Sequence, residues 1–304
     1  MPQKRQFVQQ RKRPADPAQR AKRASDEMAL SCSRLRFSEI RTMFPNCDYH
    51  THPQAHSVRP YTLELLQPWI DQCRARHIQS IAFTDHDRYI NGVDFDVIER
   101  LRDKNPDIEI LAGIELDNDP VSSENGLRWV EKNWDRLDFV LGSVHYFNGE
   151  TEMLDRTGEP GQIEARGPSE AFDQYSSELG KLISRGFIDC LAHLDLVKIH
   201  GLFPDRYDPV ARFRSILELA HRAGLAMEAS TAGWRKAVDE AYPHPAILRT
   251  AVELGIPITT ASDAHSYAQV GADFDKLALV LETANVTKIV SFSRHRINRV
   301  IRPT

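Results

Sequence analysis

Hydrophobic residues come in short runs along most of the chain, and segments with helical spacing separate them. Seven runs rich in aliphatic and β-branched residues are typical of buried strands: residues 47–50, 80–86, 108–116, 138–145, 189–195, 225–230 and 256–265. The segment "TLELLQPWIDQCRARH" has an apolar face from Leu63 to Cys73, and Thr62 is suited to cap its first turn. "PVARFRSILELAHRAG" and "PAILRTAVELG" begin with proline and end with glycine, as helices often do. Strand and helix therefore alternate about seven times.

This alternation predicts a parallel α/β sheet, either doubly wound or closed into a barrel. In the first five runs and in the seventh, His, Asp or Glu residues come at the carboxyl end. A closed barrel brings all its strand ends to one mouth, where residues distant in sequence meet. The doubly wound alternative has no glycine-rich phosphate loop to support it. We therefore predict a TIM-like (β/α)7 barrel of about seven strands, in place of the usual eight.

Composition and charge are those of a globular protein with a basic N-terminal segment. The chain has 304 residues, of which 41% are hydrophobic and 27% charged, and no apolar run approaches the length of about 18 residues that a membrane helix needs. Residues 1–46 carry eleven Lys and Arg against four Asp and Glu, a net charge of +7, which leaves −11 for residues 47–304. We expect a disordered, solvated extension over residues 1–45, a catalytic domain over 46–295 and a C-terminal tail over 296–304.

Other interpretations of the basic extension stay open. It could contact nucleic acid or an anionic membrane, it is Arg-rich like a transit peptide, or translation could begin lower down at Met43. The four cysteines are widely spaced, with no C-x-x-C pair and no secretory-type segment ahead of them. We therefore expect packing cysteines in a reducing compartment, a cytoplasmic location and no disulfide framework.

The stretch "CDYHTHPQAHS" places three imidazoles, those of His50, His52 and His56, within seven positions. A core histidine needs only one hydrogen-bonding partner, so either this is a hydrated His-rich loop or the rings are collected for a metal. Histidines two apart on a strand point to the same face, so His50 and His52 can bind one ion together. Taken alone, the stretch does not decide between the two.

Polar residues at the other strand ends favour the metal. Seven of the twelve histidines fall at strand ends or in the first loop. Each short motif alone is more typical of a hydrogen-bonded strand end. Chance would not place so many polar residues at the strand ends, however. Metal ions would compensate these groups, which are costly to bury without a partner. The residues at these ends are His50, His52, His56, Asp85, His86, Glu115, His145, His193, Asp195, Asp263 and His265.

The ordered motifs "DYHTH", "TDH", "GIE", "GSVH", "AHLD" and "SDAH" resemble those of the polymerase and histidinol phosphatase (PHP) superfamily. The stretch "EASTAGWRKAVDEAYPHPAILRTAVELGIPITTASDAH" is similar to its stand-alone histidinol-phosphate phosphatases. The resemblance covers about residues 46–295. It implies a distorted seven-stranded barrel and a site for three divalent metal ions, which could be zinc, manganese or iron.

The resemblance also implies a set of ligands. The first ion would be held by His50, His52, Glu115 and Asp263; the second by Glu115, His145 and His193; and the third by His56, His86 and His265. His56 follows His52 by only four residues, a shorter spacing than is usual in the family. Of these ligands, we expect Glu115, Asp263 and His265 to be the catalytic residues.

Such a site suits phosphomonoester hydrolysis, because ions held close together supply hydroxide at neutral pH and stabilise charge on the phosphoryl oxygens. Arg235, Lys198 and Lys236 follow strands and are predicted to bind the substrate phosphate, and Arg235 is the first choice because its guanidinium is fork-shaped. Asp87, Asp117, Asp195 and Glu240 are candidates to recognise cationic groups of a substrate.

The leading hypothesis is therefore hydrolysis of L-histidinol phosphate, a step of histidine biosynthesis, by attack of a metal-bridging hydroxide. The first alternative is a PHP phosphoesterase that acts on a nucleotide or another small phosphate ester. The second is a non-catalytic or polymerase-accessory PHP domain, which the nine occupied ligand positions disfavour. We expect a small phosphate ester as the partner, with no membrane or nucleic acid, and the sequence sets no oligomeric state.

Overall fold

The computed structural model describes residues 46–147, 150, 153–154 and 160–301. The expected basic extension over residues 1–45 lies outside the described residues.

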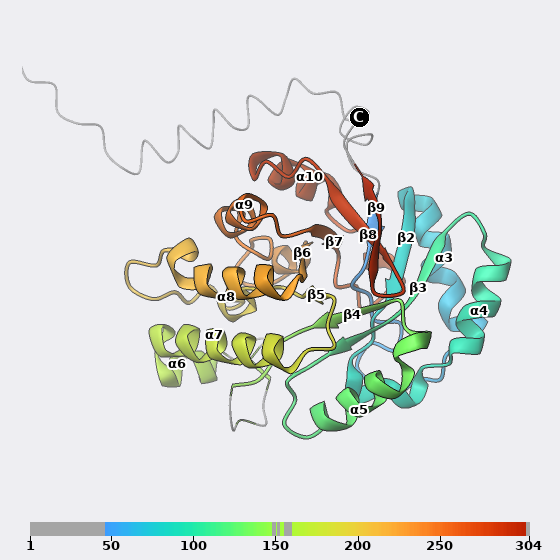
Figure 1. Cartoon of the computed structure of the whole chain (residues 1–304), viewed down its shortest axis with the longest axis horizontal. Coiled ribbons are helices and arrows are strands. Elements are labelled where there is room, and N and C mark those ends of the chain that lie inside the picture. The colour runs from blue at the N-terminus through green and yellow to red at the C-terminus, as the bar shows by residue number, and fades with distance from the viewer. Residues whose placement is uncertain (1–45, 148–149, 151–152, 155–159, 302–304) are drawn as a thin grey trace, which may run out of the picture. The chain divides into compact units, whose positions relative to one another are not determined.

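The centre of the molecule is a sheet of seven parallel strands in sequence order, each paired with the next (Figure 1). Tyr49 N donates to Thr260 O at 3.1 Å, so the first strand meets the last and the sheet closes. The prediction of a seven-stranded barrel is confirmed. The strands are β1 (Asn46–Asp48), β2 (Ile78–Phe83), β3 (Glu109–Leu116), β4 (Phe139–Gly142), β5 (Cys190–Leu191), β6 (Ala226–Ser230) and β7 (Ile258–Ala261).

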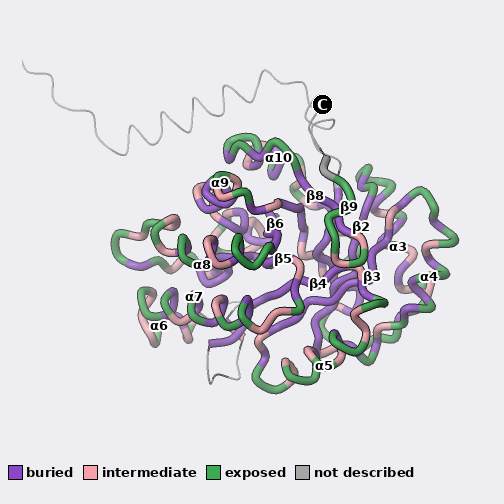
Figure 2. Tube along the Cα trace, in the orientation of Figure 1, coloured by how far each residue is buried: buried purple, intermediate pink, exposed green. Residues whose placement is uncertain are grey.

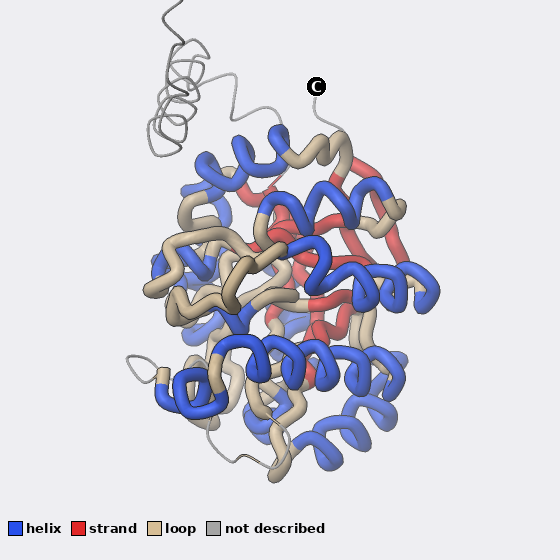
Figure 3. The backbone as a smooth tube through the Cα atoms, turned by 90° about the vertical axis from the view of Figure 1, so that its left-hand side faces the viewer, coloured by secondary structure: helices blue, strands red, loops and turns tan. Residues whose placement is uncertain are grey.

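Helices surround this barrel and cover the outer faces of its strands (Figure 3). The α-helices are α3 (Leu63–Arg76), α4 (Phe95–Lys104), α5 (Ser123–Asn133), α6 (Gly161–Arg166), α7 (Pro168–Arg185), α8 (Pro209–Ala223), α9 (Pro245–Glu253) and α10 (Phe274–Thr283). Short 3-10 turns follow four of the strands: η1 (Asp87–Gly92), η3 (Leu196–Lys198), η4 (Ala232–Arg235) and η5 (Tyr267–Gln269). A fifth, η2 (Trp134–Arg136), continues from α5.

Local sequence explains where the helices begin and end. The Thr62 side chain accepts a hydrogen bond from Leu65 N and caps α3, as predicted. Asp208 caps α8 in the same way, Pro209 opens it, and Gly224 ends it in the left-handed conformation that glycine tolerates. The apolar faces of these helices pack against the strands, which are buried throughout the sheet (Figure 2).

Two further strands, β8 (Ile289–Ser293) and β9 (Arg296–Ile301), form an antiparallel hairpin. The hairpin includes residues 296–301, which were expected to belong to a C-terminal tail. The Phe292 ring packs on the rings of Phe139 and Tyr49, with centroids 4.8 and 6.4 Å apart. The turn of the hairpin contacts Asp138 and Asp189, which immediately precede β4 and β5. The hairpin therefore covers the amino-terminal end of the barrel.

The three cysteines within the described residues, Cys47, Cys73 and Cys190, are buried and free, as expected for packing residues. Within the same residues, no helix combines the length and the apolar character needed to cross a bilayer.

Candidate metal centre

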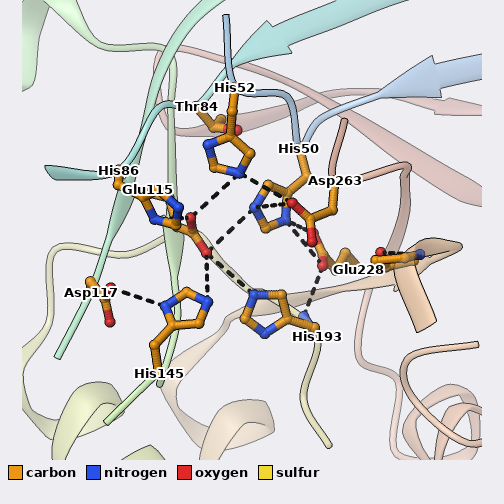
Figure 4. Close-up of polar contacts among 12 residues, drawn as sticks. His50, His52, Thr84, His86, Glu115, Asp117, His145, His193, Glu228 and Asp263 are labelled. Carbon is orange, nitrogen blue, oxygen red and sulfur yellow. Dashed lines mark hydrogen bonds and ion pairs between the residues drawn. The ribbon is translucent and has the colours of Figure 1, made fainter. Parts of the chain in front are cut away.

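The carboxyl ends of the strands meet at the other end of the barrel, and the predicted ligands gather there (Figure 4). Glu115 is the last residue but one of β3, and the histidines and Asp263 occupy the first residues after the other strands. The structure brings together His50, His52, His86, Glu115, His145, His193, Asp263 and His265.

The Glu115 carboxylate lies in the middle of this group and is fully buried. Its Oε1 atom is 3.4 Å from His50 Nε2, 3.3 Å from His193 Nε2 and 3.8 Å from His145 Nε2. These imidazoles follow β1, β5 and β4, so segments after three different strands meet at this oxygen.

The other oxygen of Glu115 serves a second set of rings. Oε2 is 2.7 Å from His86 Nδ1 and 3.6 Å from His52 Nε2. A single carboxylate therefore faces ligand nitrogens on both sides, which is the arrangement needed to bridge two cations.

Asp263 adds a second carboxylate at the carboxyl end of β7. Its Oδ1 atom is 3.2 Å from His52 Nε2, 3.7 Å from His50 Nε2 and 3.5 Å from His265 Nδ1. Asp263 has a positive φ of 52°, a left-handed conformation that is uncommon for a residue with a side chain.

His56 lies at the outer edge of the group. It is exposed, and its ring stacks on that of His265 with centroids 4.6 Å apart. The ligand atoms of His52, His86 and His265 lie within 4.8 Å of one another, whereas the predicted third group was His56, His86 and His265. His56 thus lies beside one of its two predicted co-ligands.

Carboxylates behind the ligands fix the orientation of two imidazoles. His50 Nδ1 lies 3.0 Å from Glu228 Oε2, and His193 N donates to Glu228 Oε1 at 2.8 Å. His145 Nδ1 lies 3.0 Å from Asp117 Oδ2. Each contact leaves the Nε2 atom directed at Glu115, the orientation that metal binding requires.

Sequence analysis missed Glu228, because it lies inside an apolar strand and not at its end. Arg88 was missed too; its Nη2 atom donates to Asp117 Oδ2 at 2.5 Å. The only available signal for Glu228 was a carboxylate within the run "LAMEAS". A carboxylate is almost never buried there without a partner.

The residues fit divalent cations. Within the described residues, His50 Nε2, His52 Nε2, His86 Nδ1 and both oxygens of Glu115 are buried, and their polar contacts are ion pairs with one another and with neighbouring residues of the cluster, without a hydrogen bond of regular geometry. Buried polar atoms of this kind are costly, and ions would compensate them. Imidazole nitrogens with carboxylate oxygens are donors that suit zinc, manganese and iron.

Electrostatics favour the metal-binding protonation state at three of the predicted ligands, His52, His265 and Glu115. Burial lowers the pKa of His265 to about 4, and it also holds the pKa of His52 well below its usual value, with help from His265 and His86. Burial opposes ionisation of Glu115, but the neighbouring histidines, His86 first, outweigh it and keep the pKa of this carboxyl well below its usual value. At neutral pH these three groups are therefore neutral imidazoles and a carboxylate. His50 differs: burial acts to lower its pKa, but the carboxylates of Glu228, Glu115 and Asp263 outweigh burial and hold the pKa well above its usual value, so a metal would displace a proton there.

Lys198, a predicted phosphate ligand, lies in an ion-pair network. Its ammonium is fully buried and donates to Glu240 Oε2 at 2.5 Å and to the Ala241 carbonyl at 2.8 Å. It is also 2.9 Å from Asp195 Oδ2. All of its donors are engaged, and so are Asp195 and Glu240, two of the carboxylates considered for substrate recognition.

The other two predicted phosphate ligands lie on or next to η4. Arg235 donates from Nη2 to the main-chain carbonyls of Ser262 and Asp263, at 2.5 and 3.3 Å. Lys236 is half-buried, and its ammonium makes no hydrogen bond or ion pair within the part of the chain that the structure describes. Of the three predicted cations, Lys236 has its charge least engaged by protein groups.

Comparison with known proteins gives a consistent picture. The profile of the PHP domain matches residues 48–232, a span that ends before Asp263 and His265. A protein of Deinococcus radiodurans named "Probable histidinol-phosphatase" is 35% identical over 173 residues, 55% of this chain. The match spans 62% of the length of that relative.

Two solved structures share the fold. The histidinol phosphate phosphatase of Lactococcus lactis, solved with zinc, L-histidinol and phosphate, has a TM-score of 0.61 at 21% identity, over 84% of this chain and 99% of that one. A structure from Listeria monocytogenes, also named for a histidinol phosphatase, has a TM-score of 0.62 at 19% identity, over 76% of this chain and 99% of that one. At these identities the likeness concerns the barrel itself.

Proposed function

Because the chain belongs to the PHP domain family, we propose that it is a metal-dependent phosphomonoesterase that hydrolyses L-histidinol phosphate to L-histidinol and phosphate. The observation that carries this proposal is the position of Glu115, whose two oxygens face separate sets of imidazole nitrogens. The substrate is suggested by the Deinococcus radiodurans relative.

Three divalent ions would be held by the residues at the carboxyl ends of the strands. The first would take His50, His52, Glu115 and Asp263; the second Glu115, His145 and His193; and the third His86 and His265 with His56 beside them. Bound ions would supply a hydroxide nucleophile at neutral pH and neutralise charge on the phosphoryl oxygens.

The chain's own residues would position the reactants around the ions. Glu228 and Asp117 hold His50 and His145 with their Nε2 atoms inward. Lys236, whose ammonium is not engaged by other described residues, is the predicted cation whose charge is most available for the substrate phosphate, while Lys198 is held within its ion pairs. Burial of Glu115 excludes bulk water and strengthens each of these electrostatic interactions.

Steady-state phosphate release tests the substrate. Purified protein supplied with Mn²⁺ or Zn²⁺ would be compared on L-histidinol phosphate, a 3′,5′-bisphosphonucleotide, AMP and p-nitrophenyl phosphate. We expect a preference for L-histidinol phosphate of at least about a hundredfold in kcat/KM, equal to about 2.7 kcal/mol at the transition state. Equal, slow turnover of all four would keep the hydrolase chemistry and rule out the histidinol phosphate assignment.

A further inference from the structure

The segment after β7 carries two of the metal-site residues, Asp263 and His265, on three consecutive positions of main chain. Asp263 lies in the left-handed region at a φ of 52°, where L-residues are rarely stable without support. The direction of its carboxylate therefore depends on how firmly the surrounding main chain is held.

Neighbouring strands hold most of the polar main-chain groups of this segment. Four hydrogen bonds do so: Thr231 N to Ala261 O at 3.0 Å, Ser262 N to Asp48 Oδ1 at 2.8 Å, Ala264 N to His50 O at 3.2 Å and His52 N to Ala264 O at 2.8 Å. Buried main-chain groups are nearly always paired, so the two carbonyls that these bonds leave over need donors of their own.

Those two carbonyls belong to Ser262 and Asp263, and Arg235 contacts both. Its Nη2 atom is 2.5 Å from Ser262 O and 3.3 Å from Asp263 O, and its Nη1 atom is 3.4 Å from Thr231 Oγ1. His265 Nδ1 also lies 3.3 Å from Asp263 O. Among the described residues, no other group donates to the Ser262 carbonyl.

We propose that Arg235 is a positioning residue for the metal centre: its guanidinium binds the carbonyls of Ser262 and Asp263 and thereby fixes the Asp263 carboxylate and the His265 ring toward the ions. This role rests on the metal binding of the proposed function and differs from the phosphate contact predicted from the sequence. A planar guanidinium suits the task, because several donors leave it in fixed directions, whereas lysine offers a single mobile ammonium.

Metal titration of the full chain tests this role without any substrate. Arg235→Ala, Arg235→Lys and the matched control Arg249→Ala would be stripped with a chelator, checked for folding by circular dichroism, and titrated with Mn²⁺. Arg249 is a fair control because it also donates to a main-chain carbonyl, that of Thr283 at 2.6 Å, at the end of a helix.

We expect Arg235→Ala to bind at least one ion about 10–100-fold more weakly, the usual loss when a group behind a metal ligand is removed. Arg235→Lys should retain part of the wild-type metal affinity, and the control Arg249→Ala should retain all of it. With L-histidinol phosphate, kcat should fall in Arg235→Ala after metal is restored, while KM changes little. If Arg235→Ala does not fold, the test rests on Arg235→Lys, which should bind metal more weakly than the wild type.

Wild-type metal affinity in Arg235→Ala, with a raised KM as the only change, would overturn the proposal and make Arg235 a direct phosphate contact. Failure of the proposed function would look different. The wild-type protein would then bind metal but release no phosphate, and the titration of Arg235→Ala would still report on the positioning role.

Discussion

Glu115 and Glu228 are both fully buried carboxylates, but they meet the imidazoles from opposite sides. Glu115 faces ligand nitrogens, and Glu228 faces the Nδ1 atom of His50 and the main chain of His193. A buried carboxylate is stable only where charge or hydrogen bonds compensate it. Glu228 has that compensation within the protein. Glu115 faces imidazole nitrogens, and bound cations would be coordinated by its oxygens together with those nitrogens.

Glu228→Gln should weaken metal binding while the fold persists. The amide keeps the shape of the side chain but removes the charge that makes His50 a stronger ligand, so we expect about 10–100-fold lower metal affinity. Isothermal titration of the chelated protein measures this. Glu178→Gln on α7 is the matched control, because Glu178 is also buried but pairs with Lys181. Equal metal affinity in both variants would contradict the role given to Glu228.

Lys198→Met should lower the free energy of unfolding but change the KM for the substrate little. Removal of the buried ammonium leaves the Asp195 and Glu240 carboxylates without their partner, which costs about 3–5 kcal/mol for a buried pair. Urea unfolding of the chelated protein measures the loss. Lys181→Met is the control: its ammonium is exposed, so loss of the ion pair with Glu178 should cost less than about 1 kcal/mol. Unchanged stability with a raised KM would restore Lys198 as a phosphate ligand.

At the scale of elements, the β8–β9 hairpin attaches to the barrel through His295. Its Nδ1 atom lies 2.8 Å from Asp189 Oδ2, its Nε2 atom 2.9 Å from the Trp134 carbonyl, and its ring stacks on Trp134 at a centroid distance of 3.5 Å. Partial burial acts to lower the pKa of His295, but the Asp189 carboxylate and the Trp134 carbonyl outweigh it, so the pKa is raised above 6.5.

This raised pKa predicts the direction of a pH effect. The protonated His295 stabilises the folded state fully below pH 6.5, and the contribution is lost as pH rises through the higher folded-state pKa. We expect at most about 1 kcal/mol, because solvent screens a partly exposed pair. The difference in unfolding free energy between wild type and His295→Gln should therefore shrink above neutral pH. His221→Gln, an exposed histidine of α8, controls for histidine replacement, and a pH-independent difference for His295→Gln would exclude the mechanism.

The barrel strands and their flanking helices were predictable, because apolar runs, caps and prolines are local signals. The hairpin was not: residues 294–299, "RHRINR", contain a single apolar residue, Ile297, so the run carries no strand pattern, and packing of Phe292 on Phe139 and Tyr49 supports the strand pair. Local preference is a weak guide where tertiary contacts decide.

In the candidate site, sequence position predicts which residues come together, because the carboxyl ends of parallel strands must converge. Sequence position does not predict which groups the side chains of Lys198 and Arg235 bind. Glu240, the partner of Lys198, is 42 residues away, and the carbonyls that Arg235 binds are 27 and 28 residues away. A cation at a strand end can equally bind a ligand or the protein, and only the fold chooses between these.

At the scale of the whole molecule, the two ends of the barrel carry different features. The hairpin covers the amino-terminal end, whereas buried charges and unsatisfied nitrogens gather at the carboxyl-terminal end. The candidate ligands lie at the ends of six of the seven strands, so the bound ions together would link almost the whole barrel. Metal binding should therefore stabilise the global fold.

Saturating Mn²⁺ should raise the melting temperature of the chelated protein. At a free metal concentration of 100 times Kd, the stabilisation is about 2.7 kcal/mol for one site. Differential scanning calorimetry with Mn²⁺, and with Mg²⁺ as a cation less suited to imidazole, measures the effect. An unchanged melting temperature with Mn²⁺ would mean that the cluster binds no ion in the folded state.

The most direct test of a metal-dependent phosphatase centred on Glu115 is the rate of phosphate release from L-histidinol phosphate as Mn²⁺ or Zn²⁺ is added back to chelated protein. We predict no measurable turnover without metal and recovery of activity as the sites fill. Full activity after complete removal of metal would contradict the proposed mechanism.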